Sequence, residues 1–217
     1  MSTALVVFVL VLLTPLFLAS WRVSTVGLAS QGGIMAWVAY QRDGLATVAD
    51  AIRLVDLALV RAILVPLVLY RAMAPRRLGA RNDVLAPNLI SWALALAAVL
   101  IAFRFAAHMP MAEAERPFVA AATAALLLAM LVLASSDRLF SQAVGVFRFE
   151  NALALFELAR PEPDADPTIR GGLLIVTVTT MGLVSWYLRA LLPTATAPTA
   201  PTAPTAPTAP TAAPEAR

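Results

Sequence analysis

Long apolar segments alternate with short polar ones along most of this chain of 217 residues. A membrane-spanning helix needs roughly 20 consecutive apolar residues, and seven segments approach that length. The pattern predicts an all-α fold, a polytopic integral membrane protein with about seven transmembrane helices. The segments are 3–20, 24–40, 47–72, 86–107, 117–136, 138–158 and 171–192.

The first two segments admit alternatives. Segment 3–20 has the length of a signal peptide, but no basic residue precedes its apolar run and Arg22 follows it. We therefore interpret it as a retained span. Segment 24–40 is short and contains glycine, and its loss would reverse the side of the membrane on which the N-terminus lies.

Residues 193–217 repeat Ala-Pro-Thr with a period of three. Proline lacks a backbone donor and has a restricted φ, so this composition predicts a disordered, extended tail of polyproline II character. We interpret it as a solvated tail, with a docking segment for a partner as the alternative.

The composition narrows the class of protein. Hydrophobic residues make up 60% of the chain and charged residues 13%, about half the charged share of a soluble domain. An ordinary cytosolic enzyme is therefore excluded. All 16 basic residues are arginine and do not form one continuous face, so no nucleic-acid partner is expected. Without cysteine and with the single histidine His108, the chain is expected to hold no cofactor or metal centre of its own.

Arginine positions predict the orientation, because basic residues favour cytoplasmic loops. The loop after the third segment carries four of them, and the loop after the sixth carries three acidic residues. The prediction is a bacterial cytoplasmic membrane protein with its N-terminus outside and its C-terminus in the cytoplasm. The four arginines are Arg71, Arg76, Arg77 and Arg81.

Ionisable residues stand inside the third segment, where the bilayer makes charge costly. At 100° per residue they share an arc of roughly 140°, and Pro66 leaves the carbonyl of Ala62 without a helical donor, which predicts a kink. Two interpretations remain open: an ion-paired stripe that locks the helix to its neighbours, or a role in ion conduction. The residues are Asp50, Arg53, Asp56 and Arg61.

The sixth segment carries Arg148, Glu150 and Asn151 near its midpoint. Arg148 lies about 200° around the helix from Glu150, so each needs a partner from another segment. A buried carboxylate beside a cation can change its charge near neutral pH, which is the chemistry of a proton relay. Glu157 lies seven residues after Glu150 and admits an interfacial interpretation.

Other polar residues favour structural roles. Thr177, Thr179 and Thr180 in the seventh segment are typical of helix-backbone contacts, and Gly32 and Gly33 of close packing. The chain contains no nucleophile–base, Walker or dinucleotide motif.

The sixth segment, DRLFSQAVGVFRFENALALFE, resembles the middle helix of the K subunit of bacterial complex I, with Gly145 and Asn151-Ala152 as anchors. The K subunit's usual glutamate position falls on Phe147, three residues before Glu150. An acidic residue followed directly by Asn is similar to the hydrogenase-4 component E family of group 4 membrane hydrogenases. WRVSTVGLASQ (21–31) and RAILVPL (61–67) are similar to other stretches of that family. The seventh segment departs from it, with no second carboxylate.

The resemblance implies a noncatalytic membrane subunit of a group 4 hydrogenase or related complex I-like assembly that contributes to proton or Na⁺ translocation. Residues 117–192 would be the K-like three-helix unit, 1–116 a four-helix extension and 193–217 the tail. Antiporter-like and quinone- or hydrogenase-facing subunits would be its partners, and would hold the nickel–iron and iron–sulfur centres. The implied proton pathway comprises Glu150, Asn151, Arg61, Asp56, Arg53 and Arg148.

Two other functions remain open. One is a small secondary transporter acting alone or as a homodimer, although no inverted repeat is visible in the sequence. The other is an inert scaffold subunit with the same partners.

Overall fold

The computed structural model describes residues 3–17, 20–74, 89–135, 138–160 and 166–191, and these are helical throughout apart from short connections. The all-α prediction is confirmed for this part of the chain, and each of the seven predicted segments coincides with a helical rod. The elements are α1 (Thr3–Phe17), α2 (Trp21–Asp43), α3 (Val48–Val55), the π-helix η1 (Asp56–Leu64), α4 (Val65–Met73), α5 (Leu89–His108), α6 (Arg116–Ser135), α7 (Leu139–Ala159) and α8 (Pro167–Leu191).

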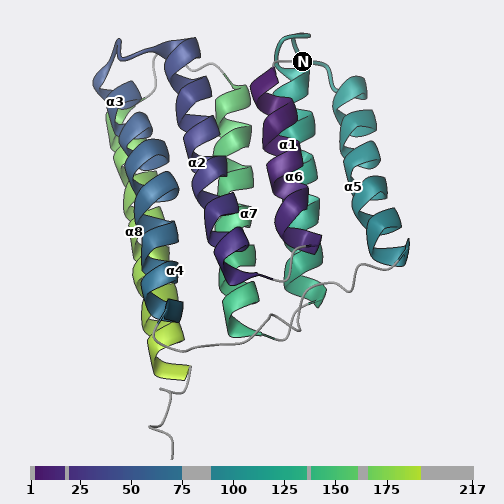
Figure 1. The fold of residues 1–217 in the computed structure, drawn as a ribbon. Coiled ribbons are helices and arrows are strands. Elements are labelled where there is room, and N and C mark those ends of the chain that lie inside the picture. The colour runs from purple at the N-terminus through teal and green to yellow at the C-terminus, as the bar shows by residue number, and fades with distance from the viewer. Residues whose placement is uncertain (1–2, 18–19, 75–88, 136–137, 161–165, 192–217) are drawn as a thin grey trace, which may run out of the picture.

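The rods stand side by side and successive rods run in opposite directions (Figure 1). The α3–η1–α4 rod and α8 form one edge of the bundle, α5 forms the other, and α2, α7, α1 and α6 lie between them. The start of α1 and the α2–α3, α5–α6 and α7–α8 connections therefore share one end of the bundle. We name this end the α2–α3 end.

Local sequence explains where the helices begin and end. Gly44 ends α2 with φ of 66°, a left-handed conformation that favours glycine, and its N–H donates to the Tyr40 carbonyl. Thr47 and Asp50 form a capping box at the start of α3. Asp166 precedes Pro167, and its side chain accepts the N–H of Thr168 at 2.8 Å, so α8 begins with an aspartate cap followed by proline.

Pro66 disturbs the third rod in a specific way. The nine residues of η1 end two positions before it, and the N–H of Val65 donates to the Val60 carbonyl five residues earlier. Because Pro66 cannot donate, the preceding turns open into the wider π-helical hydrogen-bond pattern. The kink predicted at this proline stays a prediction, and the structure shows a π-helical segment before it that contains Asp56 and Arg61.

Small residues let α6 pack closely on its neighbours. Ala121, Ala122 and Ala125 are fully buried within the main apolar cluster, and α6 contacts α1, α5 and α7. A Cβ on Gly145 of α7 would meet the Leu133 side chain of α6 at 2.7 Å. Such small-residue contacts are typical of helix pairs in membranes.

Two helices of the described chain, α6 and α8, are long and apolar enough to cross a membrane by the criteria of length and composition. Thr3–Leu13 and Trp92–His108 are shorter apolar stretches. The crossing of a membrane by all seven rods stays a prediction, as does the division into 1–116 and 117–192. The tail 193–217 and the loop arginines Arg76, Arg77 and Arg81 lie outside the described residues.

Candidate functional site

Arg61 is the centre of a buried polar network that lies about halfway along the rods, between α2, η1, α7 and α8. Its residue exposure is 8%, and all three guanidinium nitrogens donate to side chains. Nε donates to Asp56 Oδ2 at 2.7 Å, Nη1 to Asn151 Oδ1 at 3.2 Å and Nη2 to Thr177 Oγ1 at 2.8 Å. The planar fork of arginine thus joins η1, α7 and α8 at one point.

Two further hydrogen bonds extend this network. Asn151 Nδ2 donates to Gln31 Oε1 of α2 at 3.4 Å, and the Thr177 hydroxyl donates to the Leu173 carbonyl at 3.2 Å. Asn151 therefore uses its carbonyl toward Arg61 and its amide toward Gln31. Four rods of the bundle meet at these side chains.

Two carboxyl groups near this arginine each have an oxygen without a hydrogen-bond partner among the described residues. Asp56 Oδ1 and Glu150 Oε2 are buried, and neither has a hydrogen-bond partner among the described residues. Glu150 accepts a hydrogen bond from Thr180 of α8, and the charges that act on it are those of Arg61 and Asp56. One fixed cation thus faces two carboxyl groups in a region where an uncompensated charge is expensive.

The network contains three of the six predicted site residues: Asn151, Arg61 and Asp56. Glu150 is close enough for the charges of Arg61 and Asp56 to act on it. Arg148 is 2% exposed inside the bundle, and helix geometry places it on another side of α7 from Glu150. Arg53 also lies elsewhere, because its Nη1 donates to Asp43 Oδ2 at 2.8 Å. The structure therefore does not bring Arg53 into contact with Asp56, although their spacing permits it.

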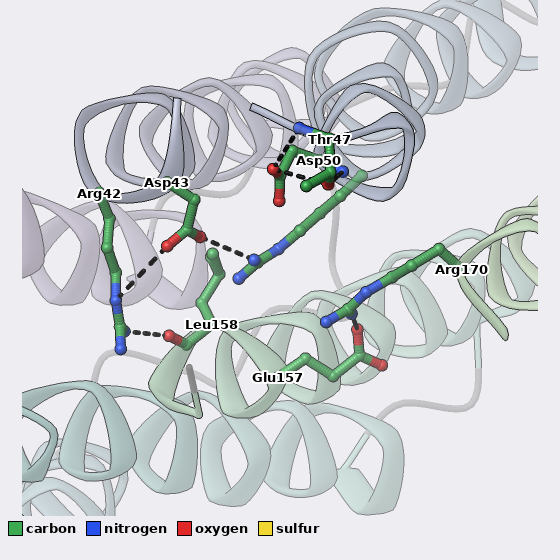
Figure 2. Close-up of polar contacts among 8 residues, drawn as sticks. Arg42, Asp43, Thr47, Asp50, Glu157, Leu158 and Arg170 are labelled. Atoms are coloured by element: carbon green, nitrogen blue, oxygen red, sulfur yellow. Dashed lines mark hydrogen bonds and ion pairs between the residues drawn. The ribbon is translucent and has the colours of Figure 1, made fainter. Parts of the chain in front are cut away.

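Arg53 pairs with Asp43, which belongs to a second polar cluster at the α2–α3 end together with Arg42, Glu157 and Arg170 (Figure 2). Here the Arg42 guanidinium donates to the carbonyl oxygen of Leu158, and Arg170 Nη1 donates to Glu157 Oε2 at 2.9 Å. These contacts join the end of α2, the end of α7 and the start of α8. Glu157 lies in this cluster near the end of α7, and its interfacial interpretation stays a prediction.

Asp50 has a local role in the same region. Its Oδ2 accepts from the N–H of Thr47 at 2.9 Å and from the Thr47 hydroxyl at 2.8 Å (Figure 2). The Asp50 N–H donates back to the Thr47 hydroxyl. Of the four charges in the third segment, only Asp56 and Arg61 reach the buried network, because Asp50 caps its own helix and Arg53 contacts α2.

Sequence reasoning missed Gln31 and Thr177 as members of the network. Thr177 makes the expected helix-backbone contact and, in addition, accepts from Arg61. The available signal for Gln31 was an amide side chain beside Gly32 in segment 24–40, where the other polar residues carry only hydroxyl groups. Both side chains are fully or almost fully buried.

Within the residues that the structure describes, no group of three or more His, Cys, Asp or Glu side chains is placed to hold a metal ion. Comparison with protein-family models, curated proteins and solved structures finds no significant match to this chain.

Proposed function

We propose that the chain is a seven-span subunit of an energy-converting assembly in the bacterial cytoplasmic membrane. Two helices with the length and composition of membrane spans support this placement. Large apolar side chains also point outward along both edges of the bundle, as with Ile90 (69% exposed) on α5 and Trp186 (68%) on α8. A bilayer or neighbouring subunits would cover these surfaces. The N-terminus would face outward and the C-terminus the cytoplasm.

The proposed contribution is translocation of protons, or of Na⁺, coupled to electron transfer elsewhere in a complex I-like or group 4 hydrogenase assembly. Antiporter-like and quinone- or hydrogenase-facing subunits would be the partners and would carry the nickel–iron and iron–sulfur centres. The sequence resemblance supports this choice of complex. This chain would be noncatalytic.

The observation that carries the proposal is the buried guanidinium of Arg61, which is hydrogen-bonded to Asp56 and whose charge also acts on Glu150. If Asp56 and Glu150 were both ionised, the site would hold an uncompensated negative charge far from the ends of the helices. A proton on Glu150 removes that charge, and its Oε2, which has no partner within the described structure, is available to hold it. Gain and loss of this proton is the step that Glu150 would contribute to a relay.

The test compares Glu150→Gln, Glu150→Asp and Glu157→Gln in complexes purified in mild detergent and in sealed vesicles. Glutamine keeps the shape of the side chain but cannot titrate, so the Glu150→Gln complex should assemble. Its proton translocation should fall by about tenfold or more, since a positioned proton donor contributes at least that factor. Glu150→Asp should retain part of the rate. Glu157→Gln, in the cluster at the α2–α3 end, should have the smaller effect.

Each alternative gives a different result. An assembled Glu150→Gln complex with wild-type proton translocation would favour the inert scaffold, in which Arg61 only holds four rods together. A lone monodisperse homodimer that transports a solute would favour the secondary transporter. Co-elution with large antiporter-like subunits supports the proposed assembly.

A further inference from the structure

A groove of about 840 Å³ opens at the α2–α3 end, between the start of α1, the last turns of α2 and the start of α6. Leu5, Val38 and Phe118 supply apolar walls, while Gln41, Arg42 and Glu113 supply polar groups. Its volume lies in the range of small-molecule sites, roughly 300–1,000 Å³. The groove is separate from the Arg61 network, which lies in the middle of the rods.

Arg42 provides the cation of this groove, and contacts with neighbouring residues fix its guanidinium group. Arg42 donates to the Leu158 carbonyl, its Nε lies 3.9 Å from Asp43 Oδ1, and its guanidinium carbon lies 5.4 Å from the centroid of the Phe118 ring. A guanidinium has five N–H donors, more than these contacts use. Glu113, in the connection that leads into α6, provides an exposed carboxylate on the same groove.

The position of the groove points to a lipid. Trp37 lines it and is 59% exposed, and tryptophan is enriched where a membrane meets water. In the proposed membrane placement, the end of α2 and the start of α6 lie at headgroup depth. Apolar walls next to one cation and one anion match an acyl chain attached to a zwitterionic headgroup.

We propose that the groove binds a phospholipid of the phosphatidylethanolamine type. The phosphate pairs with Arg42, the primary ammonium donates to Glu113, and an acyl chain lies along Leu5, Val38 and Phe118. This inference rests on the membrane placement of the proposed function and is independent of ion translocation.

The charges of Arg42 and Glu113 predict an order of affinity among phospholipid headgroups. Phosphatidylglycerol has no cation for Glu113, so it leaves that carboxylate beside a net negative headgroup. Phosphatidylcholine keeps the positive charge but has no N–H donor. The expected order of affinity is therefore ethanolamine, then choline, then glycerol headgroups.

The experiment uses the full chain, extracted from membranes in mild detergent and titrated with the three lipids carrying identical acyl chains. Bound lipid is counted by native mass spectrometry. Wild type should favour phosphatidylethanolamine over phosphatidylglycerol by about fivefold, the scale of one exposed charge pair. Glu113→Gln should abolish that preference, and Glu113→Lys should reverse it. Glu115→Gln, two residues away and outside the groove lining, is the matched control and should behave as wild type.

Ala114→Trp provides an independent variant, because Ala114 lines the groove and a large side chain there would fill it. Retention of all three lipids should then fall together. Equal binding of the three lipids by wild type, or a preference that survives both Glu113 substitutions, would overturn the proposal. Either result leaves the Glu150→Gln test unaffected, whereas recovery of the chain in the soluble fraction would overturn the membrane placement itself.

Discussion

A Cβ atom added to Gly32 of α2 would lie 2.6 Å from the backbone nitrogen of Ala62 in η1. Real Cβ atoms do not approach backbone this closely, so α2 and the π-helix can touch here only because position 32 is glycine. The contact lies next to Gln31 and Arg61, and it sets the distance across which the Arg61 network reaches α2.

Gly32→Ala should therefore separate α2 from η1. Overpacking of a tight contact costs about 1–3 kcal/mol, and here the obstacle is backbone, which cannot rotate away as a side chain does. Thermal unfolding in detergent should show a lower midpoint for this variant. Gly33→Ala is the control, because nothing lies within 4 Å of a Cβ at Gly33. Equal midpoints for the two variants would contradict the close approach.

Thr177→Val should weaken the site because it removes the acceptor for Arg61 Nη2. The change leaves a buried N–H of a charged group without its partner, at a cost of about 1–3 kcal/mol. Thr179→Val, on an exposed position of the same helix, makes the same chemical change outside the network. The midpoint of Thr177→Val should fall below that of Thr179→Val. Identical midpoints would show that the Arg61–Thr177 hydrogen bond contributes nothing to stability.

The cap of α8 should make stability depend on acid pH. Hydrogen bonds from the backbone N–H and the hydroxyl of Thr168 lower the pKa of Asp166 below its ordinary value. A group with a lowered folded pKa stabilises the fold above its unfolded pKa, near 3.9, and loses that contribution as the pH falls through the folded pKa. Asp166→Asn keeps a capping oxygen but does not titrate.

The measurement is the unfolding midpoint of wild type and Asp166→Asn as the pH is lowered from about 7 to about 2, a range that crosses the aspartate pKa. The wild-type midpoint should fall further than that of the variant. Parallel curves would show that the carboxylate is not responsible for the cap. Asp166→Ala, which removes the acceptor, should lower the midpoint at neutral pH as well.

Hydropathy alone was sufficient to predict the rods. An apolar segment of the right length has to bury its backbone polar groups in a helix, so the predicted 117–136 and observed Arg116–Ser135 differ by one residue at each end. The cap of α3 was not predicted, because Asp50 was interpreted as one of four charges on a stripe, although Thr47 and Asp50 have the spacing of a capping box. Such features depend on neighbours along the chain.

The sequence pattern did not predict which side chains on other rods contact the buried charges. Arg61 donates to Asn151 and Thr177, which lie 90 and 116 residues away in the sequence. Helical periodicity predicts the side of the helix on which a side chain lies, but it does not predict which other rod packs against that side. Spacing within one segment suggested Arg53 beside Asp56, but the long side chain of Arg53 reaches Asp43 of α2 instead. The π-helical form of η1 was equally hidden, because Pro66 predicts a lost hydrogen bond without specifying how the turns rearrange.

The alternating rods make a sharp prediction for topology. Ala46 and Ala112 are exposed in the α2–α3 and α5–α6 connections, which share one end of the bundle (Figure 1). Ala74 and Ala134 are exposed at the opposite end, where α4 and α6 finish. If every rod crosses the membrane, the residues of one pair lie on the same side, and the other pair lies opposite.

Cysteines introduced singly at these four positions test this arrangement, because the chain has no cysteine of its own. The arginine-rich loop after α4 is expected in the cytoplasm. An impermeant thiol reagent should therefore label Ala46→Cys and Ala112→Cys in intact cells, and Ala74→Cys and Ala134→Cys only after permeabilisation. A complete exchange of the two pairs would contradict the orientation but keep the seven crossings. Labelling of one residue from each pair would contradict the crossings themselves, since the two ends of the bundle cannot then lie on opposite sides of the membrane.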